Sequence, residues 1–125
     1  MSATLEESML ETVQGMVAVC RMADLEPGWG EAAWLEGTQV AVYRTEGGEF
    51  FAASHHCPGT GAKVMARGIL GDKAIAGTRV PTIACPLHKE VYRLDTGDCL
   101  SGAAPALPIH PVHLHQGMLW LEKTP

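Results

Sequence analysis

Basic side chains are scarce in the first half of this 125-residue chain, where residues 1–62 carry two of them against nine acidic ones. Aromatic residues make up 6% of the chain and the net charge is −5, so the basic surface and stacking platforms of a nucleic-acid-binding protein are missing. No apolar run approaches the roughly 20 residues of a membrane-spanning helix, and the first residues lack the basic start and apolar run of a secretory signal. We therefore expect a cytoplasmic protein that binds neither nucleic acid nor a membrane.

The chain also lacks a phosphate loop, a Gly-x-Gly-x-x-Gly fingerprint and a Gly-x-Ser-x-Gly nucleophile elbow. Neither nicotinamide binding nor hydrolysis is predicted, and we assign no catalytic residue. Four cysteines are present, and without a secretory signal they are expected to be thiols or metal ligands rather than disulfides.

What the sequence does contain is a series of short β-type runs separated by glycine turns. Residues 1–15 are assigned to an N-terminal extension that suits a short helix, and residues 16–125 to one domain. The predicted strands cover residues 16–20, 31–35, 38–44, 49–53, 80–84 and 90–94, followed by a last hairpin of 105–115 and 118–122. Because no helices alternate with these strands, the sequence predicts an antiparallel all-β sandwich or barrel.

Two cysteine loops each follow a predicted strand: residues 57–62 read Cys-Pro-Gly-Thr-Gly-Ala and residues 85–88 read Cys-Pro-Leu-His. A Rieske centre binds one iron through two thiolates and the other through two imidazoles. Its usual sequence form is Cys-x-His followed by Cys-x-x-His. Cys57, Cys85 and His88 stand at ligand positions, but Gly59 stands where the first imidazole belongs. We therefore expect a degenerate cluster-binding tip without a cofactor, and a [2Fe-2S] cluster is the alternative.

His56 is the nearest substitute for the missing imidazole. Adjacent residues of an extended segment point to opposite sides, so recruiting His56 would require a rebuilt loop. A mononuclear zinc ion held by Cys57, Cys85, His88 and His56 has an acceptable ligand count and is a second alternative. In an empty site the two thiols are expected to lie close enough to form a disulfide.

Basic residues are more frequent between positions 63 and 93, where there are six of them and two acidic residues. This segment includes the second cysteine loop and begins just after the first. Any single lysine of this segment is explained by its exposure to solvent and needs no functional role. As a cluster, Lys63, Arg67 and Lys89 are predicted to form a docking face for an acidic partner protein.

Five strings in the chain match a known family: 27–30 (Pro-Gly-Trp-Gly), 38–44, 67–72 (Arg-Gly-Ile-Leu-Gly-Asp), 86–89 and 92–100. In these strings the chain resembles the small subunit of the cytoplasmic NAD(P)H-dependent nitrite reductase, which has a Rieske-like domain. The resemblance implies a non-catalytic subunit whose large partner carries sirohaem, an iron–sulfur cluster and flavin and reduces nitrite to ammonium in nitrate assimilation. Members of this family commonly lack the cluster ligands, and Cys57, Cys85 and His88 depart from that pattern.

Two other functions remain open at this point. A freestanding Rieske-type [2Fe-2S] ferredoxin would carry electrons to an oxygenase or reductase. An interaction module with neither metal nor a reductase partner would use the fold alone, because a fold does not by itself define a function.

Overall fold

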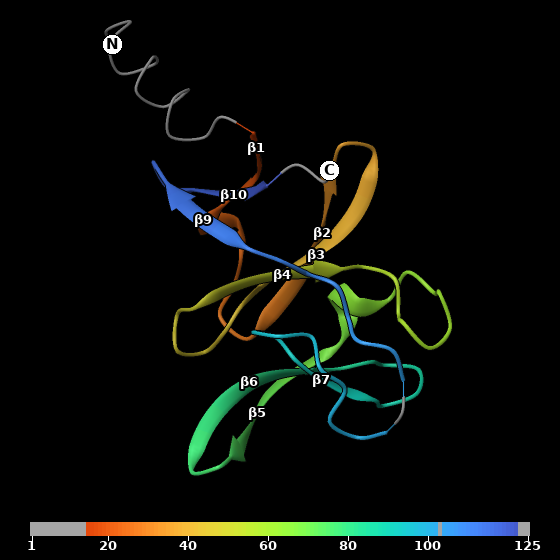
Figure 1. Ribbon diagram of the computed structural model, residues 1–125. Helices are drawn as coiled ribbons and strands as arrows, with labels where there is room; N and C mark the ends of the chain where they lie inside the picture. The colour runs from red at the N-terminus through yellow and green to blue at the C-terminus, as the bar shows by residue number, and fades with distance from the viewer. Residues whose placement is uncertain (1–14, 103, 123–125) are drawn as a thin grey trace, which may run out of the picture.

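The described part of the chain, residues 15–102 and 104–122, is all-β in the computed structural model (Figure 1). Its strands are β1 (Met16–Arg21), β2 (Trp29–Leu35), β3 (Thr38–Arg44), β4 (Phe50–Ser54), β5 (Ile69–Ile75), β6 (Thr78–Ala84), β7 (Val91–Arg93), β8 (Ile109–His110), β9 (Val112–His115) and β10 (Met118–Glu122). Two short 3₁₀ turns, η1 (Met22–Asp24) and η2 (Met65–Arg67), are the only helical segments among these residues. None of the described helices is long and apolar enough to cross a membrane.

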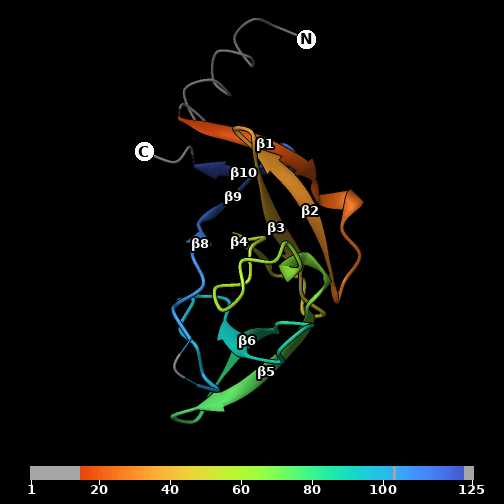
Figure 2. The same ribbon diagram turned by 90° about the vertical axis from the view of Figure 1, so that its right-hand side faces the viewer.

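The strands pair in antiparallel fashion, as the sequence predicted, and they form three sheets. The central sheet has the order β2-β3-β4-β8, and the sheets β1-β10-β9 and β5-β6-β7 lie on either side of it (Figures 1 and 2). The two cysteine loops lie next to each other at one edge of the molecule, on the right-hand side of Figure 1. Strands β4 and β6 lead into these loops, so two different sheets hold the two halves of the tip.

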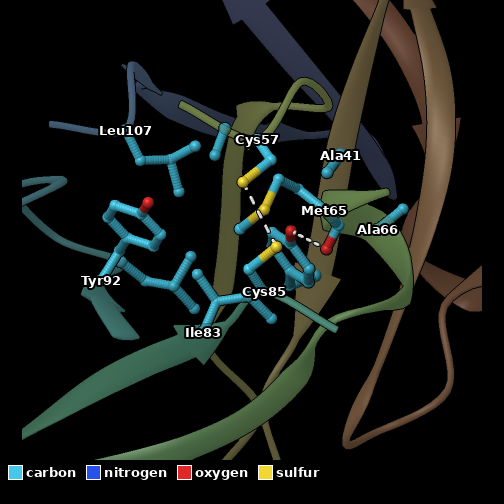
Figure 3. Packing of buried hydrophobic residues seen from close by; sticks show 11 residues of the cluster. Ala41, Cys57, Met65, Ala66, Ile83, Cys85, Tyr92 and Leu107 are labelled. Atoms are coloured by element: carbon cyan, nitrogen blue, oxygen red, sulfur yellow. Dashed lines mark hydrogen bonds between the residues drawn. The ribbon is translucent and has the colours of Figure 1, made fainter. Parts of the chain in front are cut away.

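Two hydrophobic clusters hold the sheets together. One packs the central sheet against β1 and β10 and includes Leu35, Val42, Leu119 and Leu121. The other lies beneath the loops and is formed by Ala41, Tyr43, Ala53, Cys57, Met65, Ala66, Ile83, Cys85, Tyr92, Leu94 and Leu107 (Figure 3). Both loop cysteines are therefore part of the core. The hydroxyl of Tyr43 donates a hydrogen bond to the carbonyl of Met65 and ties the central sheet to η2.

The predicted strands agree with the structure to within a few residues, with two corrections. Strand β5 was not predicted, because Gly71 and Asp72 are weak strand formers. It forms because all seven of its residues pair with β6 across a turn at Ala76 and Gly77, both with positive φ. The strand predicted from residue 105 begins only at Ile109. The predicted N-terminal helix lies almost wholly outside the described residues.

Candidate functional site

The first loop turns tightly around Cys57. The N–H of Cys57 donates to the carbonyl oxygen of Ala62 (2.8 Å), and the N–H of Gly61 donates back to the carbonyl oxygen of Cys57 (2.7 Å). Gly61 has a φ of 77°, a left-handed conformation that glycine adopts at little cost. The loop therefore closes on itself and directs the cysteine side chain inward, where it is 1% exposed.

The second loop repeats this arrangement around Cys85. The N–H of Cys85 donates to the carbonyl oxygen of Glu90 (2.8 Å), and the N–H of Lys89 donates back to the carbonyl oxygen of Cys85 (2.8 Å). Lys89 has a φ of 58° and occupies the position that Gly61 has in the first loop. The two loops thus have the same hydrogen-bond pattern, although only one of them has glycine at the strained position.

The two loops bring their thiols together. The Sγ atoms of Cys57 and Cys85 lie 3.2 Å apart, with the thiol of Cys85 donating to the sulfur of Cys57 (Figure 3). Both side chains are buried. This juxtaposition, which the sequence predicted, gives two sulfur donors that a single metal ion could share.

Backbone amides of both loops also point at the sulfurs. Burial opposes ionisation of Cys57, but hydrogen bonds from the Cys85 thiol, the Thr60 hydroxyl and the amides of Gly59 and Thr60 outweigh it and lower the pKa of Cys57. Burial raises the pKa of Cys85, although the loop amides of His88 and Leu87 work in the opposite direction. Within the pair, Cys57 is therefore the sulfur that becomes a thiolate first.

Residues of both loops line a pocket of about 400 Å³, namely Gly59, Thr60, His88 and Glu90. His88 is exposed at its rim, where the sequence predicted an imidazole donor. Gly59 contributes no side chain, but a Cβ added there would lie 2.9 Å from Oε1 of Glu90. Glu90 was not a candidate in the sequence, where it counted only as one acidic residue among basic ones. The sequence signal that could have pointed to Glu90 is its position two residues after His88, in the same loop.

Tyr92 adds a buried donor next to the thiols. Its side chain is fully buried in the cluster that contains Cys57 and Cys85, and its hydroxyl has no hydrogen-bond partner among the described residues. Burial raises the pKa of Tyr92, and the neighbouring Glu90 and cysteines raise it further. A buried hydroxyl without an acceptor is unfavourable by about 1–3 kcal/mol, so an additional acceptor beside the sulfurs would stabilise it.

The alternative zinc site is not preformed. His56 is half-buried and forms an isolated backbone bridge with Lys63. Across residues 15–102 and 104–122, no three His, Cys, Asp or Glu side chains are gathered so that they could hold a metal ion. The assignment of His56 as a ligand remains a prediction.

The three predicted docking residues are all exposed at the tip. Lys63 and Arg67 line one hollow of about 460 Å³ together with His55 and Glu31, while Lys89 lies in the second loop. Two large apolar side chains are exposed in the same region, Leu87 (56%) in the second loop and Ile69 (69%) just after η2. The tip therefore combines positive charge with exposed apolar surface.

Two matched cysteine loops at the edge of three antiparallel sheets define a Rieske-like domain. A profile of the Rieske-like [2Fe-2S] domain family matches residues 15–122, and the chain belongs to this family. The nitrite reductase (NADH) small subunit of Salmonella typhimurium is 28% identical over 105 residues, which are 83% of this chain and 94% of that subunit. The resemblance inferred from the sequence is thereby confirmed.

A nitrite reductase large subunit from Klebsiella oxytoca is also similar, with 33% identity over 104 residues. The matched region is 83% of this chain but 10% of that subunit, so the chain spans about a tenth of its length. A chain of known structure from Mycobacterium tuberculosis, described as an NADH-dependent nitrite reductase small subunit, has a TM-score of 0.78 and 30% identity, covering 88% of this chain and 96% of that one.

A Sphingomonas yanoikuyae B1 ferredoxin has a TM-score of 0.69 at 23% identity, over 86% of this chain and 98% of its own. That likeness shows a common fold and nothing further about function.

Proposed function

We propose that the chain is the small, non-catalytic subunit of an NAD(P)H-dependent nitrite reductase, and that it associates with a large subunit on which nitrite is reduced. The observation that carries this proposal is the pair of similarities to nitrite reductase subunits. One relative is a small subunit matched over 94% of its length, and the other is a large subunit that includes a similar region. A domain found within one large subunit would, as a separate chain, have to bind its partner through its surface.

The surface offered for this contact is the basic tip formed by Lys63, Arg67 and Lys89. Charged groups around an apolar centre steer association and set its orientation, and here Leu87 and Ile69 supply exposed apolar area. An acidic patch on the large subunit is the complementary partner. Such an encounter weakens as ionic strength rises, because exposed charges are screened over roughly 8 Å at physiological salt.

The proposed role requires no Rieske centre of the ordinary kind in this chain. Of the two imidazole positions in the Rieske pattern, only that of His88 is filled, since Gly59 has no side chain. The role of a ferredoxin that acts alone would depend on such a centre, and the ferredoxin likeness supports only the fold. We also propose a cytoplasmic location, where a reducing environment suits the four free cysteines of this chain.

The test is association with the large subunit. The tagged full-length chain should capture a sirohaem-containing large subunit from an extract of its own source. Replacing Lys63, Arg67 and Lys89 together with glutamate should weaken this binding at low salt by at least about tenfold in Kd.

A matched control reverses three basic residues away from the tip, Arg21, Lys73 and Arg79, and so changes the net charge by the same amount. This control should bind as tightly as the wild type. Equal weakening in both variants would contradict the assigned docking face. Failure of the wild-type chain to capture any large subunit would contradict the proposed function itself.

A further inference from the structure

The space next to Gly59 holds the carboxylate of Glu90. A Cβ at position 59 would lie 2.9 Å from Oε1 and 3.9 Å from Oε2 of Glu90. The missing imidazole would have begun at that Cβ. The carboxylate thus stands in the volume that the absent side chain would have used, and it does so from the opposite loop.

The second loop fixes the backbone from which this carboxylate extends. The carbonyl oxygen of Glu90 accepts the N–H of Cys85 at 2.8 Å, so the backbone of Glu90 is held next to that of Cys85. Its side chain is half-buried and faces the pocket that His88 also lines. Within the described residues Glu90 forms no ion pair. A carboxylate placed in this way has lone pairs available for a metal.

We propose that Glu90 supplies the donor that position 59 lacks, so that Cys57 and Cys85 hold one iron of a [2Fe-2S] centre and His88 and Glu90 hold the other. This ligand set differs from the two-thiolate, two-imidazole set of a Rieske centre. It also differs from the empty site that the count of donors in the sequence favoured. When bound, the centre supplies one-electron transfer.

Two observations in this chain suit the proposal. The thiols are already 3.2 Å apart and receive amide hydrogen bonds from both loops. Tyr92, which belongs to the same buried cluster as the thiols, has a hydroxyl without an acceptor among the described residues. No three donor side chains converge on one point among the described residues. A two-iron centre needs only two protein donors per iron.

A carboxylate ligand should measurably change the reduction potential of the iron–sulfur centre. Imidazole is neutral as a ligand, whereas carboxylate carries a negative charge. Net charge is one of the determinants of the reduction potential of an iron–sulfur centre, because added negative charge favours the oxidised form. The centre held by Glu90 should therefore have a lower potential than one in which a histidine at position 59 replaces it.

The test is anaerobic reconstitution of the full chain with ferrous iron and sulfide, followed by removal of loosely bound metal. The wild type should retain about two irons and two sulfides per chain and give a paramagnetic resonance signal after reduction. Glu90→Gln keeps the shape but removes the anionic donor, and should retain at least about tenfold less iron. Glu36→Gln, in a turn far from the tip, is the control and should retain as much as the wild type.

The double variant Gly59→His with Glu90→Ala provides a second measurement, because it offers two imidazoles. It should bind iron and show a higher midpoint potential than the wild type. Circular dichroism establishes that each variant is folded. A wild type that retains no iron, or a Glu90→Gln variant that retains as much as the wild type, would overturn the proposal. Neither result bears on association with a large subunit, which is measured separately.

Discussion

The Sγ atoms of Cys57 and Cys85 lie 3.2 Å apart although 28 positions separate the two residues in the chain. Each cysteine is held by a loop with the same hydrogen-bond pattern, and each loop is attached to a different sheet. The short distance between the two thiols therefore depends on how the two sheets pack against each other.

In metal-free protein this pair should oxidise. Formation of a disulfide removes two protons and two electrons from the thiols, which dissolved oxygen or glutathione disulfide accepts. Air-exposed, metal-free protein unfolded without reductant should show two free thiols, those of Cys20 and Cys99, and four after reduction. The cross-link should stabilise the fold by about 3 kcal/mol, because it closes a long loop.

Thiol titration of two variants provides the control for this disulfide. Cys20→Ser leaves the pair intact and should still lose two thiols on oxidation, whereas Cys85→Ser should lose none. Four free thiols in the air-exposed wild type would contradict the expectation.

Gly59→His should increase the retention of iron during reconstitution. The atoms nearest to a Cβ at position 59 all belong to the end of the flexible Glu90 side chain, which can turn away, so the backbone need not move. Retention against a chelator should rise by at least about tenfold over the wild type, because an imidazole takes the place of the Glu90 carboxylate and completes the two-thiolate, two-imidazole set.

Gly102→His is the matched control for this experiment, because a Cβ added there has nothing within 4 Å. It should leave iron retention unchanged. A colourless Gly59→His protein after reconstitution would show that the loops do not hold a cluster-binding geometry.

Gly97→Ala should destabilise the domain by about 2–3 kcal/mol. Gly97 has a φ of 86°, and an added Cβ would collide with the carbonyl oxygen of Leu107. The N–H of Leu107 also donates to the carbonyl oxygen of Gly97 at 2.8 Å, so the two segments cannot separate without losing this bond. Urea unfolding measures the loss.

Gly117→Ala isolates the contribution of the collision. Gly117 has a φ of 75°, but an added Cβ there meets nothing within 4 Å. The free energy of unfolding of this variant should fall by only about 1 kcal/mol, the energy needed to hold alanine at a positive φ. Equal losses in Gly97→Ala and Gly117→Ala would show that the contact with Leu107 is unimportant.

The stability of the domain should fall as the pH drops below about 6.5, in part through His110. Burial lowers the pKa of His110 from its model-compound value of 6.5, so the unfolded chain binds the proton more tightly than the folded one. The stabilisation is present at neutral pH and is lost as the pH falls from about 6.5 toward the lower pKa of the folded state.

His110→Gln tests this dependence, because the glutamine side chain does not titrate. The free energy of unfolding should fall less in this variant than in the wild type between pH 7.5 and 5.5. All other titrating groups are common to the two proteins and cancel in the difference. Identical pH dependence in both would contradict a role for His110.

The strands and the cysteine loops could be predicted from local patterns. Strand β3 was predicted with its observed bounds, Thr38–Arg44, because its side chains follow a continuous β-type run ended by turn residues. Strand β5 could not be predicted in this way, because its stability depends on pairing with β6 rather than on the preferences of Gly71 and Asp72.

The sequence alone determined that Cys57, Cys85 and His88 have the identity of metal ligands and that Gly59 does not. It did so because donor chemistry is a property of each side chain by itself. The paired loops also led us to expect that the two thiols lie close together, but only the tertiary structure gave their separation of 3.2 Å and placed Glu90 beside Gly59. Those distances arise from the packing of two sheets and the closure of two loops, and no local pattern in the chain encodes a distance across them.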